Sequence, residues 1–418
     1  MHQQIVRNLP RIQDWFGSYR DEVDLPFYSS YDIRDSGHKV ANVDANIYPA
    51  GFNNICPTDR ESAPPLVRFY LDRHYGVGKV KKLLLITEEH TNNAYYWENV
   101  ASLVEILRGA DLEVCVAIPR LQQERAVMTT ASGRTVEVVS ATIDRSGLKC
   151  SCFTPDLVVS NNDFSEFYPE WGELNEMHLN PPRELGWWQR KKSNYFLHYN
   201  KLSTEFAKLI DVDPWTLTVE TELFSEFDMA NDSSREALAQ RVQTMIDRLR
   251  AEYARRGISD EPVVFVKNNA GTYGLAVMRA ASGEDILNLN YKTRKKMKAA
   301  KGGRDVEEVI IQEGIPSIVQ ADGITAEPTL YLFGCQLAGG FLRSHSEKGP
   351  TESLNSPGAV YKRLCVSDLK ISVEGHPMEN VYGWSARLGV LAIGHEAKAL
   401  GSIYRGYSRR GDLSCTLT

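Results

Sequence analysis

Residues 263–277 read VVFVKNNAGTYGLAV, and this stretch contains the main indication of the fold. The apolar run predicts a buried strand that carries Lys267 to its end, and Gly271 and Gly274 follow in a loop. In such a loop, backbone N–H groups can approach phosphate oxygens while the lysine supplies positive charge. The stretch matches neither the GxxxxGKS nor the GxGxxG type of motif, so a simple hairpin with glycines in its turn is the alternative.

A second strand end lies downstream in VIIQEGIP at 309–316. Gln312 and Glu313 close a predicted strand there, and Gly314 and Ile315 follow. Alternating backbone groups at such a strand end are suited to the edge of a purine base, although many strands end in this way. We therefore treat Gln312, Glu313 and Ile315 as candidate base-binding residues.

A third strand, GGFLR at 339–343, ends in Arg343, and the loop after it contains Asn355. The planar guanidinium of arginine binds two oxygens of an oxyanion at once, which suits it to a phosphoryl group in transfer. Arg343 is therefore a candidate for the reacting centre, and we consider Asn355 and Lys267 with it.

The rest of the chain alternates strands and helices, which predicts an α/β fold. KKLLLITEE at 81–89 and LEVCVAIP at 112–119 are predicted strands on either side of a helix at 95–110, a βαβ unit. Residues 1–75 are rich in turn formers and are expected to hold short strands. Further predicted elements are a strand at 155–161 and helices at 201–210, 235–256 and 381–399.

Composition excludes several classes of protein. The 418 residues are 42% hydrophobic and 24% charged, which are ordinary values for a globular chain. The net charge of −6 argues against a general nucleic-acid binder. The longest apolar runs are far shorter than the ~20 residues of a membrane helix, and the N-terminus lacks a secretory signal, so we expect no membrane association and a cytoplasmic location.

The seven cysteines are scattered and odd in number, and the nearest pair, Cys150 and Cys152, has CxC rather than CxxC spacing. In a reducing compartment such cysteines are expected to be free thiols, with disulfides or a zinc site as the alternatives.

The order of these pieces along residues 200–363 resembles the ATP-grasp ligases, particularly bacterial glutathione synthetase. That resemblance implies a site in which two lysines contact the phosphates of ATP and a hinge strand reads adenine. It implies the following roles for residues of this sequence: Lys201, Lys267, Gly271 and Gly274 for the phosphates; Gln312, Glu313 and Ile315 for the base; Glu327 as the acidic residue near the nucleotide; and Arg343 and Asn355 for an acyl phosphate.

One part of that pattern is missing from its usual place. The chain ends in GYSRRGDLSCTLT at 406–418, where the ATP-grasp ligases have strands with Mg²⁺ ligands. YDIRDSGHKVANVDANIYPAGFNN at 31–54 resembles those strands, which implies that Asp32, Asp44 and Asn46 supply hard oxygen ligands for Mg²⁺ from the other end of the chain. The alternative is a hairpin in which Asp and Asn serve as turn formers.

The expected domain organisation is therefore interleaved. A Rossmann-like domain at 76–195 precedes an ATP-grasp domain at 196–418, and residues 1–75 complete the ATP-grasp domain.

Together with PDLVVSNNDFS at 155–165, RKKSNYF at 190–196 and NKLSTEFAKL at 200–209, the N-terminal segment resembles the proteobacterial glutamate–cysteine ligase family. The resemblance implies ATP- and Mg²⁺-dependent joining of the glutamate γ-carboxylate to the cysteine amine through an acyl phosphate, the first step of glutathione synthesis. Glutamate, cysteine and ATP would be its small-molecule partners, and a homo-oligomer is compatible with it. A glutathione synthetase, another ligase of the same fold, and a nucleotide-binding protein without activity are the alternatives.

Several other polar segments have both a functional and a structural interpretation. The basic run YKTRKKMKAAKGGR at 291–304 is either a solvated helix face or a lid that attracts ATP or an acidic substrate. Glu88–Asn93 and Asn161–Asp163 follow predicted strands, where open α/β sheets hold ligands, or they form ordinary loops and caps. Arg34 is suited either to a substrate carboxylate or to a salt bridge with Asp35.

Overall fold

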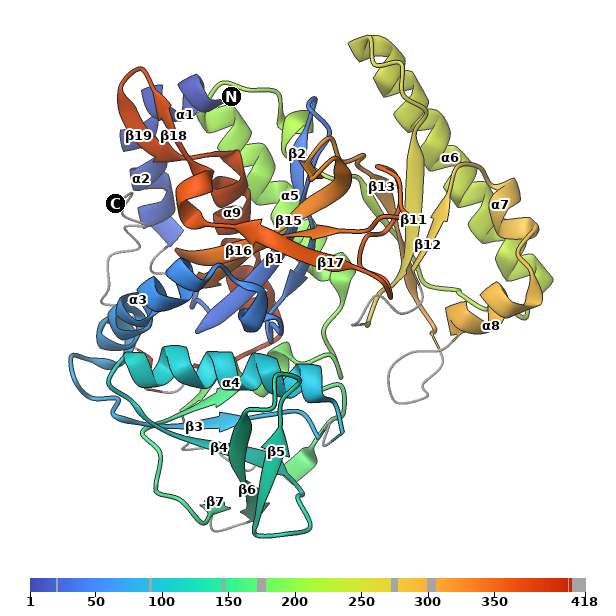
Figure 1. The fold of residues 1–418 in the computed structure, drawn as a ribbon. Coiled ribbons are helices and arrows are strands. Elements are labelled where there is room, and N and C mark those ends of the chain that lie inside the picture. The colour runs from blue at the N-terminus through green and yellow to red at the C-terminus, as the bar shows by residue number, and fades with distance from the viewer. Residues whose placement is uncertain are drawn as a thin grey trace.

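The structure is a computed structural model, and it describes residues 1–19, 22–89, 92–144, 147–170, 178–271, 277–298, 306–404 and 406–407. Figure 1 shows an antiparallel sheet at the centre, a mixed sheet below it, and a smaller sheet with α6 to one side. We call these the central, mixed and small sheets. Gly274 and part of the basic run lie outside the described residues.

The central sheet joins segments from the two ends of the chain. Strand β1 pairs with β15, so that Tyr28 faces Phe333, and β2 pairs with β1 on the outer side. In Figure 1 the blue strands β1 and β2 accordingly lie beside the orange strands β15 and β16. The strand order is β17 (Val360–Leu364), β16 (Gln336–Ser344), β15 (Ile324–Phe333), β1 (Tyr28–Asp35) and β2 (Val40–Asn46), with β14 (Gln320–Ala321) against β15.

The mixed sheet contains the predicted βαβ unit. Strand β3 (Lys82–Ile86) is followed by α4 (Ala94–Gly109) and by β4 (Glu113–Pro119), which confirms the expected elements. The chain later returns to the other side of β3 as β8, so the strand order reverses between β3 and β8. The full order is β5 (Arg125–Thr129), β6 (Thr135–Asp144), β4, β3, β8 (Leu157–Ser160) and β9 (Leu179–Asn180), with β7 (Gly147–Cys150) against β6, and α3 (Pro57–Tyr75) lies beside α4.

The small sheet is antiparallel and is covered on one face by the long helix α6 (Asp232–Arg256). Its strand order is β10 (Thr221–Phe224), β13 (Val309–Gly314), β11 (Val263–Asn268) and β12 (Val277–Ala280), and α7 (Glu284–Leu287) and α8 (Tyr291–Lys298) follow β12. The helix presents an apolar stripe at helical spacing to this sheet, which explains why it forms and packs here. The stripe consists of Val242, Met245, Ile246 and Leu249, in one core cluster with Val264, Val266 and Ile311 of the sheet.

Two helices form the core behind the central sheet. α9 (Val381–Ala399), which the sequence predicts, is buried on nearly all sides and packs on α5 (Lys192–Leu209), β1 and β2. Gly389 permits this close packing, because a Cβ atom there would lie 2.5 Å from the Tyr31 ring. The remaining elements are α1 (His2–Arg7), α2 (Leu9–Ser18), β18 (Lys370–Val373), β19 (His376–Glu379) and the 3₁₀ turns η2 (Phe52–Asn54), η4 (Arg183–Leu185), η5 (Pro214–Thr216) and η7 (Val366–Leu369). None of the helices in the described part of the chain combines the length and apolar character that crossing a membrane requires.

Two expectations about helices are confirmed only in part. Residues 1–75 contain the helices α1, α2 and α3 besides strands, and Pro64 and Pro65 lie inside α3, where proline normally breaks a helix. The helix expected at 201–210 begins nine residues earlier, at Lys192. In α3, tertiary packing outweighs the local preference that the sequence pattern measures.

Cys56 and Cys365 form a disulfide across 309 positions of sequence, so the expectation of free thiols is wrong for this pair. The bond joins the start of α3 to the residue that follows β17. Spacing along the chain does not reveal such a pair, because only the fold brings the two cysteines together. The other cysteines in the described residues are free thiols: Cys115, Cys150, Cys152 and Cys335.

Candidate active site

A narrow cavity lies between the central sheet and the small sheet, and we call it the inter-sheet cavity. Its volume is about 70 Å³, below the roughly 300–1,000 Å³ of typical ligand pockets, so its walls must separate before a larger ligand can bind. It brings together most of the residues singled out from the sequence: Asp32, Asp44, Lys267, Gly271, Gln312, Glu313, Ile315, Glu327 and Asn355.

Carboxylates and arginines alternate on the central-sheet wall of this cavity. Asp32 on β1 faces Asp44 on β2, and Glu327 on β15 faces Arg343 on β16. The guanidinium of Arg343 donates to Asp32 and to Glu327, at 2.8 Å each, and Arg34 donates from Nε to Glu327 at 2.5 Å. Although burial opposes ionisation, the two arginines hold the pKa of Glu327 below its usual value.

Burial and neighbouring cations affect the two aspartates differently. Burial raises the pKa of Asp32, and Arg343 opposes only part of this effect. Burial also opposes the ionisation of Asp44, but Lys192 and Lys267 hold the pKa of Asp44 below its usual value. In this cavity the lysines therefore stabilise the ionised form of Asp44, whereas Arg343 offsets only part of the cost of burying an ionised Asp32.

Lys267 lies on the opposite wall, on strand β11. Its Nζ donates to Gln312 Oε1 at 2.6 Å and to the main-chain oxygen of Val43 at 3.0 Å. Burial lowers the pKa of this lysine to about 8. Gly271 follows in the loop, where a Cβ atom would lie 2.8 Å from the Asn268 side chain. The lysine is held in the cavity, and a nearby anion would favour its charged form.

Apolar side chains form part of the same cavity. Val43 comes from the central sheet, Phe265 and Val277 come from the small sheet, and Ile315 follows β13. These apolar side chains lie among a larger number of charged and polar ones, so the cavity offers apolar surface beside charge.

A larger cavity of about 1210 Å³ lies between the central and mixed sheets. Glu88 follows β3, and Asn161 and Asp163 follow β8, and all three residues line it. The strand order reverses between these two strands, and open α/β sheets hold their ligands at such a point. We call this second cavity the switch-point cavity.

A buried hydrogen-bond network forms one wall of the switch-point cavity. Tyr96 donates to Asn161 Oδ1 at 3.0 Å, and Asn161 donates to the main-chain oxygen of Pro49 at 2.9 Å. Asn99 Oδ1 accepts from the backbone N–H of Gly51 at 2.8 Å. Because these bonds link α4 and β8 to the segment after β2, they fix the central and mixed sheets relative to each other.

The two cavities meet at three residues. Asn355 lines both cavities, Asp32 lines the inter-sheet cavity, and Arg343 lines the switch-point cavity. The buried Nε atom of Arg343 has no hydrogen-bond partner among the described residues. Since buried donors are normally paired, this N–H group is suited to a bound ligand.

The structure places two predicted residues away from the inter-sheet cavity. Lys201 is exposed on α5 and lines neither cavity, whereas Lys192, at the start of the same helix, lines the inter-sheet cavity and forms an ion pair with Asp44. Nine residues correspond to about two and a half helical turns, so the two lysines lie on opposite faces of α5. Asn46 lines the switch-point cavity, whereas Asp32 and Asp44 line the inter-sheet cavity.

Sequence reasoning missed two buried lysines of this region. Lys192 belongs to the segment RKKSNYF at 190–196, so a basic run before a helix was the available signal. Lys39 precedes β2 and forms an ion pair with Glu313 at 2.7 Å. No local pattern marks Lys39, because its partner is 274 positions away.

The other polar segments that the sequence singles out differ in where their side chains lie. Arg34 pairs with Glu327 rather than with Asp35, since consecutive residues of a strand point to opposite faces. Glu89 accepts a hydrogen bond from Tyr168 at 2.8 Å. In the basic run, Lys292 and Lys295 of α8 are exposed, which is typical of a solvated helix face. His90, Thr91, Lys301 and Arg304 lie outside the described residues.

Two adjoining cavities with charged groups at their junction are the arrangement expected of an enzyme that brings different substrates together. The chain matches the model of the family GshA, glutamate–cysteine ligase, over residues 2–397. It therefore belongs to the glutamate–cysteine ligase family and is a ligase.

Solved structures were also compared. A protein from Methylobacillus flagellatus KT, provisionally named gamma-glutamylcysteine synthetase, is 34% identical, with 95% of each chain covered and a TM-score of 0.83. D-alanyl-alanine synthetase A from Vibrio cholerae O1 biovar eltor strain N16961 is 11% identical, with 75% of this chain and 82% of that chain covered, and its TM-score of 0.34 supports no conclusion. A comparison with curated proteins finds no match.

Proposed function

We propose that this ligase follows the ATP-grasp plan and joins the glutamate γ-carboxylate to the cysteine amine where its two cavities meet. ATP would occupy the inter-sheet cavity, and the amino acids would occupy the switch-point cavity. The observation that supports this assignment most is the junction itself, where Arg343 and Asp32 connect the cavities at 2.8 Å. A phosphoryl group from one cavity and a carboxylate from the other can meet there.

The walls of the inter-sheet cavity suit the two ends of a nucleotide. Phe265 and Ile315 offer apolar surface for a purine, next to the main chain at Glu313. Lys192 and Lys267 offer positive charge for the phosphates on the same cavity. Because a phosphate near Lys267 would stabilise the charged lysine, nucleotide binding would raise its pKa from about 8.

Hard oxygen donors on the central-sheet wall fit Mg²⁺. Asp32, Asp44 and Glu327 line the cavity together, and burial raises the pKa of Asp32 beside the other carboxylates, a situation that a divalent cation would relieve. These carboxylates already pair with basic side chains, which would share them with the ion. When bound, Mg²⁺ would supply charge neutralisation at phosphate oxygens.

The switch-point cavity suits amino-acid substrates. Its 1210 Å³ volume accommodates two small molecules. The carboxylates of Glu88 and Asp163 are suited to ammonium groups, and Arg343 is suited to an oxyanion. The amino acids would therefore lie with their reacting groups toward the inter-sheet cavity.

Positioning and charge neutralisation would drive the reaction in this site. A carboxylate is a poor electrophile, so an oxygen of the γ-carboxylate first bonds to the γ-phosphorus of ATP while the bond to ADP breaks. The cysteine nitrogen then bonds to the acyl carbon, the carbon–oxygen bond to phosphate breaks, and the nitrogen loses a proton. Arg343 would neutralise negative charge on the transferred group in both steps, because its guanidinium lies at the junction of the cavities.

ADP release tests this proposal. It is measured with glutamate alone, with glutamate and cysteine, and with γ-glutamylcysteine and glycine, each with ATP and Mg²⁺. We expect rapid release with glutamate and cysteine and little with the third mixture. Release with the third mixture would indicate a glutathione synthetase, and the absence of release with glutamate and cysteine would contradict the proposal.

A further inference from the structure

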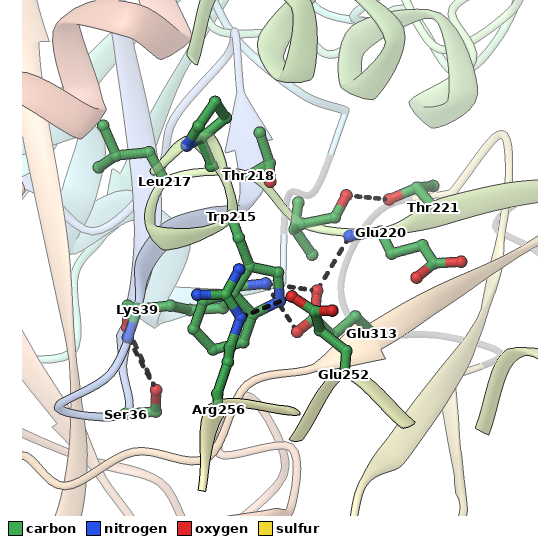
Figure 2. Close-up of polar contacts among 12 residues, drawn as sticks. Ser36, Lys39, Trp215, Leu217, Thr218, Glu220, Thr221, Glu252, Arg256 and Glu313 are labelled. Atoms are coloured by element: carbon green, nitrogen blue, oxygen red, sulfur yellow. Dashed lines mark hydrogen bonds and ion pairs between the residues drawn. The ribbon is translucent and has the colours of Figure 1, made fainter. Parts of the chain in front are cut away.

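A buried ion pair lies behind the strand that borders the inter-sheet cavity. Lys39 is 3% exposed, and its Nζ donates to both carboxylate oxygens of Glu313, at 2.7 and 2.8 Å. The backbone N–H of Glu220 donates to the same carboxylate at 3.1 Å. Figure 2 shows these groups converging from three segments of the chain.

An aromatic side chain holds Lys39 in this place. The ring of Trp215 lies between two cations, with Lys39 Nζ 4.3 Å and the Arg256 guanidinium 4.0 Å from its centroid. Arg256 in turn donates to Glu252 and to Asp213, at 2.6 Å each. Figure 2 shows the indole in this stack, with Arg256 coming from the end of α6. The ammonium group thus has a fixed direction of approach to Glu313.

The ion pair of Lys39 and Glu313 lies on the face of β13 that points away from the cavity. Gln312 faces the cavity, where it accepts from Lys267, so the next side chain, Glu313, points to the other face of the small sheet. Lys39 does not line the cavity, whereas Glu313 does, so the main chain of Glu313 is the part that borders it. Lys39 precedes β2 of the central sheet, and the pair therefore connects the two walls of the cavity.

We propose that Lys39 is a positioning residue for the nucleotide base: it holds Glu313 so that the main chain at 313–315 meets the edge of the base. This inference rests on the proposed binding of ATP in the inter-sheet cavity. A buried ion pair contributes little net stability, but it fixes the geometry of both partners, and that property is the one required here. The effect should fall on the base and not on the phosphates, which Lys192 and Lys267 approach from elsewhere in the cavity.

The variant Lys39→Met tests the proposal, because methionine keeps the length of the side chain without its charge. The expected result is a rise in the KM and the dissociation constant for ATP of at least about five-fold, the effect of one lost hydrogen bond. Inhibition by inorganic tripolyphosphate, which has no base, should be unchanged. The KM values for glutamate and cysteine, and kcat, should stay within about two-fold of the wild type.

Lys362→Met is the matched control, because it removes an exposed lysine–carboxylate pair with Asp322 and should leave every constant unchanged. If Lys39→Met fails to fold, Glu313→Gln replaces it, since glutamine keeps an acceptor oxygen and should raise the KM for ATP in the same direction. Equal weakening of ATP and tripolyphosphate, or a lower kcat with an unchanged KM for ATP, would overturn the inference. If the wild type itself binds no ATP, the proposed function fails instead, and direct binding measurements on the wild type distinguish the two cases.

Discussion

Among single residues, Arg343 is the one on which the proposed chemistry at the junction of the cavities depends most. It is buried, donates to Asp32 and Glu327, and keeps one N–H group without a partner among the described residues. The two carboxylates raise its pKa further against the effect of burial, so the group stays charged in the site. A permanently charged, planar donor that lines the switch-point cavity is suited to an oxyanion there.

Arg343→Lys should lower kcat about 10²–10³-fold, because a lysine is a point charge and cannot reach both carboxylates and the transferred group together. The KM for ATP should change much less. Steady-state kinetics check both values, and Arg250→Lys, in an exposed pair with Asp247, is the control. An unchanged kcat would show that Arg343 has only a structural role.

Asp44→Asn should raise the Mg²⁺ concentration required for half-maximal activity at least about ten-fold, since it removes a hard anionic ligand from the inter-sheet cavity. Asn46→Ala is the comparison, because Asn46 lines the switch-point cavity and should affect the Mg²⁺ dependence less. Activity titrated with Mg²⁺ at saturating ATP measures both. A Mg²⁺ dependence identical to that of the wild type would remove Asp44 from the metal site.

At the scale of elements, the sequence predicts a helix or strand well where a single local pattern of apolar residues determines it. The ranges 235–256 and 381–399 correspond closely to α6 and α9, whose apolar residues recur at helical spacing. The pattern fails for α3, because packing overrides Pro64 and Pro65. The start of α5 is also misplaced, although Tyr195, Phe196 and Tyr199 already lie at helical spacing before residue 201. Local rules cannot include the neighbours that a helix meets only after folding.

The ion pair between Glu98 of α4 and Arg134 should make the free energy of unfolding depend on pH. Burial opposes the ionisation of Glu98 on α4, but hydrogen bonds from Arg134 and Ser132 lower its pKa to about 2, from an ordinary value near 4.5. A lowered carboxyl pKa stabilises the fold above about 4.5, and this contribution is lost as the pH falls toward 2.

Glu98→Gln should therefore lower the Tm at pH 7, and the difference from the wild type should shrink as the pH falls below about 4.5. Thermal denaturation from pH 7 to pH 3 measures this difference. A difference that stays constant over this range would contradict the assigned pKa.

At the scale of the whole molecule, the sequence predicts those candidate-site residues that lie on strands. Lys267, Gln312 and Arg343 all lie on strands, whose apolar residues make them recognisable in the sequence. The choice between Lys192 and Lys201 depends on how α5 is rotated against α9, which packing of the core decides. The sequence does not indicate a role for Lys39, because that role depends on Trp215 and Glu313 from distant segments.

The Cys56–Cys365 disulfide should stabilise the whole chain, because it cross-links residues 309 positions apart. Such bonds typically contribute about 2–4 kcal/mol. Cys365→Ser should lower the Tm, and a reducing agent should lower the Tm of the wild type but not that of the variant. Thiol counting by mass spectrometry would test directly whether the bond forms. Equal Tm values for wild type and variant without reductant would show that the bond does not form.

The pairing of β1 with β15 has a consequence for biosynthesis. Asp32 and Arg343 are 311 positions apart, so at about 5–20 residues per second the ribosome makes Asp32 tens of seconds before its partner. During that time the apolar face of β1, with Tyr31 and Ile33, lacks α9, on which it packs in the complete fold. The junction of the two cavities is assembled only near the end of translation, and a chain released before β16 is made cannot contain it.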